Sequence, residues 1–210
     1  MAIDNKPQPI EKHPLEPFIP EDARVLICGT FPPQQKRWSM HFYYPNFIND
    51  FWRIMGLIFF GDKERLVDRE HKTFRLEEIK SLLRREGIAM SDTGKEVIRT
   101  RDNASDKYLS ILKPIDLAGT LSLMPGCRAV VTTGEKAAGI IAEQTGTKIP
   151  PTGECVPFEN PDLSGKHRIL YHWRMPSTSR AYPLPLEKKA EAYRRMLETV
   201  GLPETPQNPD

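Results

Sequence analysis

Short apolar runs and helical repeats of apolar residues alternate along most of the chain. Four runs have the composition of buried β-strands, at residues 24–28 (RVLIC), 87–92 (GIAMSD), 127–134 (CRAVVTTG) and 168–173 (RILYHW). Each run is short and is bounded by glycine, proline or polar residues. This pattern favours strands that are covered on both faces.

Between these runs, apolar residues recur at the three- and four-residue spacing of amphipathic helices. The repeats cover residues 47–58, 76–83, 117–124, 135–146 and 186–200. Gly87, Gly146 and Gly201 follow three of them, where a left-handed residue commonly ends a helix. The chain is therefore predicted to alternate between helix and strand.

This alternation predicts a three-layer α/β/α domain with a central, mainly parallel four-stranded sheet over residues 22–201. Ligands bind to such sheets outside the carboxyl ends of the strands. We therefore expect a functional pocket among the loops that follow Cys28, Met90, Val131 and Tyr171. Residues 1–21, which are rich in proline, and residues 202–210 are expected to form an extension and a tail outside the regular core.

The composition narrows the possible functions. Three scattered cysteines provide neither a disulfide framework nor a Cys-x-x-Cys motif. The five histidines lack the spacing of metal ligands, so His41, His71 and His172 are predicted to be structural, and no metal or cofactor is expected. No apolar run approaches the roughly 18 residues of a membrane span, and the N-terminus does not resemble a secretory signal, so a cytoplasmic location is expected. The formal net charge is +2, so any surface for nucleic acid must be local.

Three segments could carry chemistry. The loop Gly29-Thr30-Phe31-Pro32-Pro33 follows the first strand and matches neither the Rossmann nor the P-loop fingerprint. Residues 38–52 interleave aromatic rings, which stack on nucleobases, with amides, which can bind a base edge or a water. The alternative is that Phe47, Phe51 and Trp52 are core residues at helical spacing. Residues 175–180 (MPSTSR) place hydroxyls, backbone amides and a cation after the last strand, as in a loop that binds phosphate.

The order of these motifs resembles that of the uracil-DNA glycosylase superfamily, most closely its hypoxanthine-DNA glycosylase-like branch. The resemblance covers most of residues 24–182 and rests on GTFPP, a tyrosine-rich stretch ending in NDFW, GIAMSD, a strand followed by TGEKA, and MPSTSR. It implies a monofunctional enzyme that hydrolyses the N-glycosidic bond of a damaged base flipped out of DNA, without a cofactor.

The resemblance also implies roles for individual residues. Asn49 corresponds to the amide that positions the attacking water and is the catalytic candidate. The base would be bound by Gly29, Thr30, Phe31, Phe47 and Asp92, and the DNA backbone by Pro176, Ser177, Thr178, Ser179 and Arg180. Asp92 stands where relatives often have Asn, so it would be protonated through burial, bind a different edge of the base, or face the water. A capping role in the following turn is its alternative.

Two other functions remain open at this point. The first loop contains no carboxylate or amide, which leaves a nucleic-acid or nucleotide-binding module that has the fold without the chemistry. A hydrolase of free nucleosides or nucleotides is the third possibility, and indifference to a DNA strand would distinguish it.

Overall fold

The computed structural model describes residues 9–101, 106–161 and 167–202. Its central sheet has the strand order β5 (Ile88–Asp92), β2 (Val25–Gly29), β8 (Ala129–Thr133), β10 (His167–Met175) and β9 (Glu154–Pro161). The first four strands are parallel to one another, and β9 pairs antiparallel with β10 at the edge. The mainly parallel sheet is thus confirmed.

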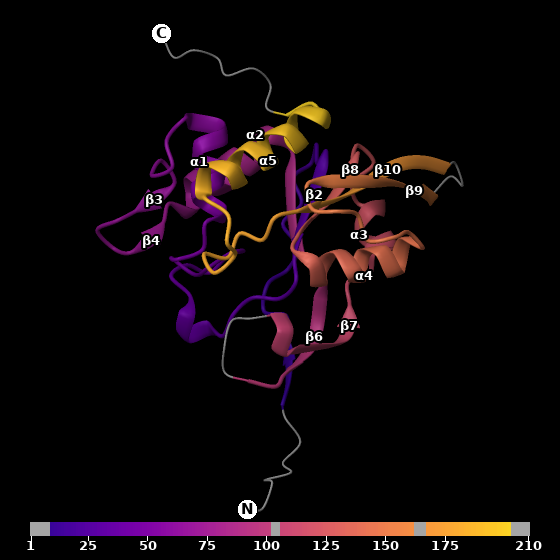
Figure 1. Cartoon of the computed structure of the whole chain (residues 1–210), viewed down its shortest axis with the longest axis horizontal. Coiled ribbons are helices and arrows are strands. Elements are labelled where there is room, and N and C mark those ends of the chain that lie inside the picture. The colour runs from indigo at the N-terminus through magenta and orange to yellow at the C-terminus, as the bar shows by residue number, and fades with distance from the viewer. Residues whose placement is uncertain (1–8, 102–105, 162–166, 203–210) are drawn as a thin grey trace, which may run out of the picture.

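Helices cover both faces of this sheet (Figure 1). One face is covered by α1 (Phe51–Phe60), α2 (Leu76–Glu86) and α5 (Leu186–Thr199), and the other by α3 (Leu117–Ser122) and α4 (Glu135–Thr145). Alternate residues of β2 supply the two cores, since Val25 and Ile27 belong to the first and Leu26 and Cys28 to the second. This alternation explains why the strand is apolar throughout its length.

The predicted sheet of four strands is wrong in its count, because β9 adds a fifth. Its sequence, ECVPFENP, contains two prolines and several polar residues, which do not form an apolar run. Proline cannot donate a backbone hydrogen bond, so it is tolerated on an edge strand such as this one.

The structure contains two further sheets that the apolar pattern did not indicate. β1 (Ile10–Lys12), β6 (Gly94–Arg99) and β7 (Leu109–Pro114) form an antiparallel sheet in the order β1, β6, β7. β3 (Val67–Asp68) and β4 (Thr73–Phe74) form a short hairpin beside α1. Two 3₁₀ turns, Gln35–Arg37 and Asp106–Tyr108, complete the elements.

The described part of the predicted N-terminal extension is integrated into the structure. β1 belongs to the small sheet, and Phe18 exchanges two backbone hydrogen bonds with Met90 of β5. Residues 1–8 and 203–210, which include most of the predicted C-terminal tail, lie outside the described residues.

The glycines at the helix ends have the expected conformation. Gly87 and Gly146 follow α2 and α4 with φ values of 64° and 66°. A Cβ at Gly87 would also collide with the carbonyl oxygen of Asp22, so the residue allows the close approach of two segments as well as the turn. No helix within the described ranges is long and apolar enough to cross a membrane.

His172, on β10, is buried within the sheet as a neutral side chain. Its Nε2 lies 3.2 Å from Thr132 Oγ1, whose hydroxyl donates to Trp173 O. The Nε2 atom therefore carries the proton, and Nδ1 has no hydrogen-bond partner among the described residues. Burial lowers the pKa of His172 to about 4.

This arrangement predicts a dependence of stability on pH. Below its ordinary pKa of about 6.5, His172 takes up a proton in the unfolded chain but not in the folded one, so stability falls between about pH 6.5 and about pH 4. The loss should reach about 3 kcal/mol at most. Urea unfolding of the wild type and His172→Leu at several pH values measures it, and the variant should lack this component. Identical pH profiles would contradict the assignment.

Candidate active site

A cleft of about 560 Å³ opens where three parallel strands of the central sheet end. Gly29, Asp92 and Thr133, the last residues of β2, β5 and β8, all line it. β5 lies on one side of β2 and β8 on the other, so the direction of winding reverses at β2. This is the position at which sheets of this kind form ligand sites.

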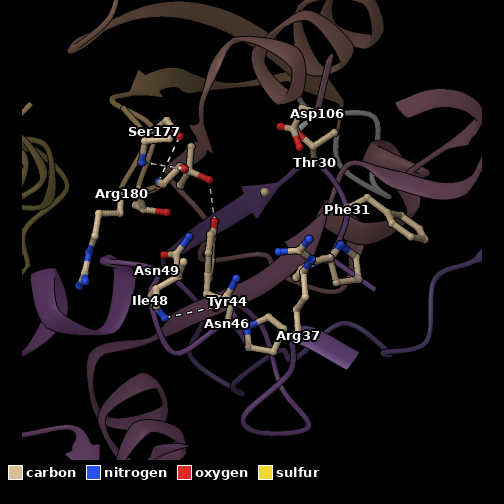
Figure 2. Close-up of a pocket in the computed structure, with 18 of the residues that line it drawn as sticks. Thr30, Phe31, Arg37, Tyr44, Asn46, Ile48, Asn49, Asp106, Ser177 and Arg180 are labelled. Carbon is tan, nitrogen blue, oxygen red and sulfur yellow. Dashed lines mark hydrogen bonds between the residues drawn. The ribbon is translucent and has the colours of Figure 1, made fainter. Parts of the chain in front are cut away.

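The cleft brings together most of the residues that the sequence indicated. Gly29, Thr30, Phe31, Asn49, Asp92, Ser177, Thr178, Ser179 and Arg180 all line it. Figure 2 shows Asn49 and Arg180 on one side of Tyr44, and Thr30, Phe31 and Asp106 on the other. Phe47 and Pro176 are not among the lining residues.

The structure places Phe47 outside both the cleft and the helix predicted to contain it, since α1 begins at Phe51. The guanidinium of Arg53 lies 4.9 Å from the centre of the Phe47 ring, and the Phe74 ring lies 5.6 Å from it. These contacts hold the Phe47 ring beside the start of α1. The ring therefore does not line the cleft, where it could stack on a base.

Tyr44, which the sequence did not single out, lines the cleft between these two groups of residues. Its ring stacks on Phe51 at 3.9 Å between centroids, and its hydroxyl lies 2.7 Å from Thr133 Oγ1. A Cβ at Gly29 would lie 2.6 Å from Asp92 Oδ1 and 3.4 Å from the Tyr44 hydroxyl. Glycine at this position therefore keeps open the space into which both polar groups face.

Asp92 is held by a histidine from the N-terminal segment. Nε2 of His13 lies 2.9 Å from Asp92 Oδ2, and both side chains are almost completely buried. The His13 ring also lies edge-on to Phe31, and its Nδ1 lies 2.8 Å from the carbonyl oxygen of Leu15. The hydrogen bond occupies Oδ2, which leaves Oδ1 as an acceptor facing the space above Gly29.

A second carboxyl group lines the cleft beside Thr30. The Thr30 hydroxyl donates to Asp106 Oδ2 at 2.6 Å. Burial raises the pKa of Asp106, and the hydrogen bond from Thr30 opposes this effect. The first loop has no acid of its own, but the structure supplies one to it from the turn between β6 and β7.

Asn49 lies two residues before α1 with its amide fixed in orientation. Its Oδ1 accepts the backbone N–H of Phe51 at 2.8 Å, and its carbonyl oxygen accepts from Arg53 Nη1 at 3.1 Å. Because Oδ1 faces the helix, the amide nitrogen carries the donors that remain for a ligand in the cleft.

The loop after β10 is anchored at its base and exposes hydroxyls at its tip. The carbonyl oxygen of Pro176 accepts from the buried Tyr193 hydroxyl at 2.9 Å. Ser177 Oγ accepts from the Ser179 N–H and Ser179 Oγ accepts from the Ala181 N–H, at 3.2 and 3.3 Å. Each hydroxyl therefore keeps its own proton available for an anion.

A buried ion pair joins this loop to the residue that follows Asn49. Lys189 of α5 is 1% exposed, and its Nζ donates to Asp50 Oδ2 at 2.9 Å and to Ser179 O at 2.8 Å. The Asp50 N–H donates to Thr178 O at 3.0 Å. The position of the Asn49 amide is thus tied to the position of the loop.

Charge is segregated within the cleft. Its acidic residues, Asp92 and Asp106, lie near the strand ends, whereas its cationic residues are Arg37, Lys107 and Arg180, of which all three are exposed. Among the described residues, no three His, Cys, Asp or Glu side chains gather as they would around a metal ion.

The residues missed from sequence are those whose role depends on distant contacts. His13, Asp106 and Lys189 lie 79, 76 and 139 positions from their partners in the site. Tyr44 belonged to the aromatic stretch, and its unusual left-handed backbone (φ 50°) has no sequence signature. The local signal for Lys189 was its position on the apolar stripe of its helix, three residues after Leu186 and four before Tyr193, where a lysine is unusual.

Comparison with solved structures identifies a similar fold. The chain resembles the solution NMR structure of a protein from Methanosarcina acetivorans described as a "putative Uracil DNA glycosylase", with a TM-score of 0.56 and 22% sequence identity. The similarity covers 90% of this chain and 99% of that chain. At this level of identity it shows a shared fold. No protein-family model and no curated protein matches the sequence.

Removing Lys189 should destabilise the protein, because Asp50 would stay buried without its close partner. Its remaining ion-pair contact, with Arg180, is longer at 3.5 Å. We expect Lys189→Met to lower the free energy of unfolding by about 3 kcal/mol, and the addition of Asp50→Asn to restore part of it. Urea unfolding measures both effects.

The neighbouring Lys188 provides the control, since it pairs with Glu191 in solvent. Lys188→Met should leave the unfolding midpoint unchanged. Equal effects of the two lysine substitutions would show that the buried pair does not stabilise the site.

Proposed function

We propose that the protein is a monofunctional DNA glycosylase that hydrolyses the N-glycosidic bond of a flipped deaminated base, uracil or hypoxanthine. The observation that carries this proposal is the cleft itself, where a fixed amide and two carboxyl groups lie inside a rim of cations. The neighbour described as a uracil DNA glycosylase adds support at the level of the fold.

The size and charge of the cleft suit one extruded nucleotide. A volume of about 560 Å³ is within the usual range for small-molecule sites. An enzyme must extrude a base to reach its glycosidic bond, and the flanking phosphates then stay outside the pocket. Exposed Arg37 and Arg180 can contact those phosphates, while the base enters the less charged interior.

The groups at the bottom of the cleft can bind the pairing edge of either base. Uracil and hypoxanthine each carry an N–H beside a carbonyl. Asp92 Oδ1 can accept the N–H, and the hydroxyl pair of Tyr44 and Thr133 has a proton left to donate to the carbonyl oxygen. Among the roles left open for Asp92, this arrangement supports that of an acceptor, which needs no proton on Oδ1.

The reaction breaks the bond between the sugar C1′ and the base nitrogen, and the bonding electrons leave with the base. Water then adds to C1′ of the oxocarbenium-like sugar and loses a proton. The Asn49 amide can donate to the water oxygen and hold it in place, and the proton passes to the surrounding solvent. Neither step requires a cofactor.

Labelled oligonucleotides that carry uracil, hypoxanthine, xanthine or a mismatched thymine test this function. Base release followed by alkaline cleavage should produce strand scission with at least one of them, while the free nucleosides should remain intact. Binding without scission would instead support a nucleic-acid-binding module, and cleavage of free nucleosides would support a nucleoside hydrolase.

Replacement of Asn49 should separate chemistry from stability. We expect Asn49→Ala to lower single-turnover base release by about 100-fold, because the positioned donor is lost. The variant should remain folded, with a loss of about 1 kcal/mol from the missing contact to Phe51 N–H.

The matched control is Asp116→Ala, which removes the side-chain cap of α3 far from the cleft (2.9 Å to Gly119 N). It should cost similar stability without slowing base release. Normal excision by Asn49→Ala would remove Asn49 from the catalytic role.

Asp92→Asn should change which bases are excised. Its amide can accept from His13 through oxygen and would then present a donor to the cleft, where the wild type presents an acceptor. We expect the ranking of the four test bases to change in single-turnover assays. If the ranking stays the same while the melting temperature falls, Asp92 only anchors the N-terminal segment.

A further inference from the structure

A second hollow of about 580 Å³ lies next to the cleft and is lined mostly by cations. It lies among the start of α1, the β3–β4 hairpin and the start of α5, which Figure 1 shows on the same side of the molecule. Arg180 lines both the cleft and this hollow, so the two adjoin at that side chain. We call the hollow the basic groove.

The charges of the basic groove are unbalanced. Its lining includes six cationic residues and two acidic ones. Both acids already have close partners, since Asp50 is bound by Lys189 at 2.9 Å and Glu64 by Arg69 at 2.9 Å. Four positive charges then remain in excess, on Arg53, Lys63, Lys72 and Arg180, of which Arg180 also makes a longer contact with Asp50 at 3.5 Å.

The two lysines of the groove are the most available of these cations. Lys63 and Lys72 are exposed, and neither has an ion-pair partner among the residues that the structure describes. Lys63 follows α1, and Lys72 lies in the turn between β3 and β4. An extended anion along the groove could contact both.

Arg53 is a rigid cation in the wall of the groove. Its Nη1 donates to Phe47 O at 2.8 Å and to Asn49 O at 3.1 Å, and its guanidinium lies over the rings of Phe47 and Phe74. Burial lowers its pKa, and Arg180 and Arg69 lower it further, against the opposite effects of Glu64 and Asp50. An anion in the groove would relieve this crowding of positive charge.

We propose that the basic groove binds the phosphate backbone of the DNA strand on one side of the nucleotide held in the cleft. The proposal rests on the proposed function, because it assumes that the cleft receives a nucleotide from a strand. Because Arg180 lines both the cleft and the basic groove, the phosphates next to that nucleotide would pass Arg53 and reach Lys63 and Lys72. The aromatic ring of Phe47 thereby contributes to DNA binding by supporting Arg53.

The test measures binding of undamaged, fluorescently labelled single strands by anisotropy over a range of salt concentrations. Lys63→Ser/Lys72→Ser should weaken binding of a strand of about 15 nucleotides roughly tenfold and lower its salt slope by about 1.4, the loss of two phosphate contacts. A strand of about five nucleotides, which is too short to fill both sites, should bind the variant and the wild type similarly.

The control variant is Lys113→Ser/Lys148→Ser, which removes the same charge from two exposed lysines that line neither the cleft nor the groove. It should retain the salt slope of the wild type for both strands. Equal losses in the two double variants, or a loss on the short strand as large as on the long one, would overturn the proposal.

These outcomes are independent of base release. If the wild type excises no base but the groove variant loses affinity for the long strand alone, the groove binds DNA and the proposed enzyme activity is wrong. If the wild type excises a base and the groove variant keeps the full salt slope, the activity stands and the strand leaves the cleft by another path.

Discussion

The shape of the cleft depends on the buried ion pair between Lys189 and Asp50. An ammonium group in the interior is costly unless it is paired and fully hydrogen-bonded, and here it has the Asp50 carboxylate and the carbonyl oxygen of Ser179. The N–H of Asp50 in turn binds Thr178. The start of α1, the loop after β10 and α5 therefore cannot move apart without leaving a charge unpaired. The side of the cleft that holds Asn49 and Arg180 keeps its shape through this constraint.

In the proposed complex with DNA, the cationic and acidic side chains contact different parts of the substrate. The exposed cations of the cleft and of the basic groove can approach phosphates and remain hydrated in the free protein. The acids lie at the strand ends, each with a hydrogen-bond partner that fixes one oxygen. A phosphate would be repelled from the interior, whereas a neutral base with an N–H to donate would be accepted there. In the proposed complex, specificity for the base and affinity for the strand would thus arise from separate surfaces.

Local patterns in the sequence predicted the parts of the fold that depend on burial. The four parallel strands are apolar because helices cover both of their faces, and glycines mark helix ends because the left-handed conformation favours them. β9 was missed because an edge strand tolerates proline and polar residues. β6 and β7 were missed because their sheet has only partly buried faces.

The candidate site was predictable as far as it follows the strand ends. Gly29, Thr30 and Asp92 end strands or follow them directly, so topology alone brings them together. Phe47 was assigned to the cleft through the family resemblance, yet its ring packs against Phe74 and Arg53 beside the first core and does not line the cleft. His13 and Asp106 reach the cleft through tertiary contacts between segments far apart in the chain, and no local periodicity encodes such contacts.

The hydrogen bond from His13 to Asp92 has a consequence for how the protein can be divided. Residues 22–201 contain every element of the central sheet and its helices, but a fragment with those limits would lose Leu202 from the first core and Leu15, Phe18 and Ile19 from the residues packed against the two cores. It would also lack the imidazole that occupies Asp92 Oδ2, together with β1 and the two backbone bonds of Phe18. The layered sheet and the walls of the cleft therefore have different boundaries in this chain. The shorter fragment would present a buried carboxylate free to turn, and with it a cleft of altered selectivity.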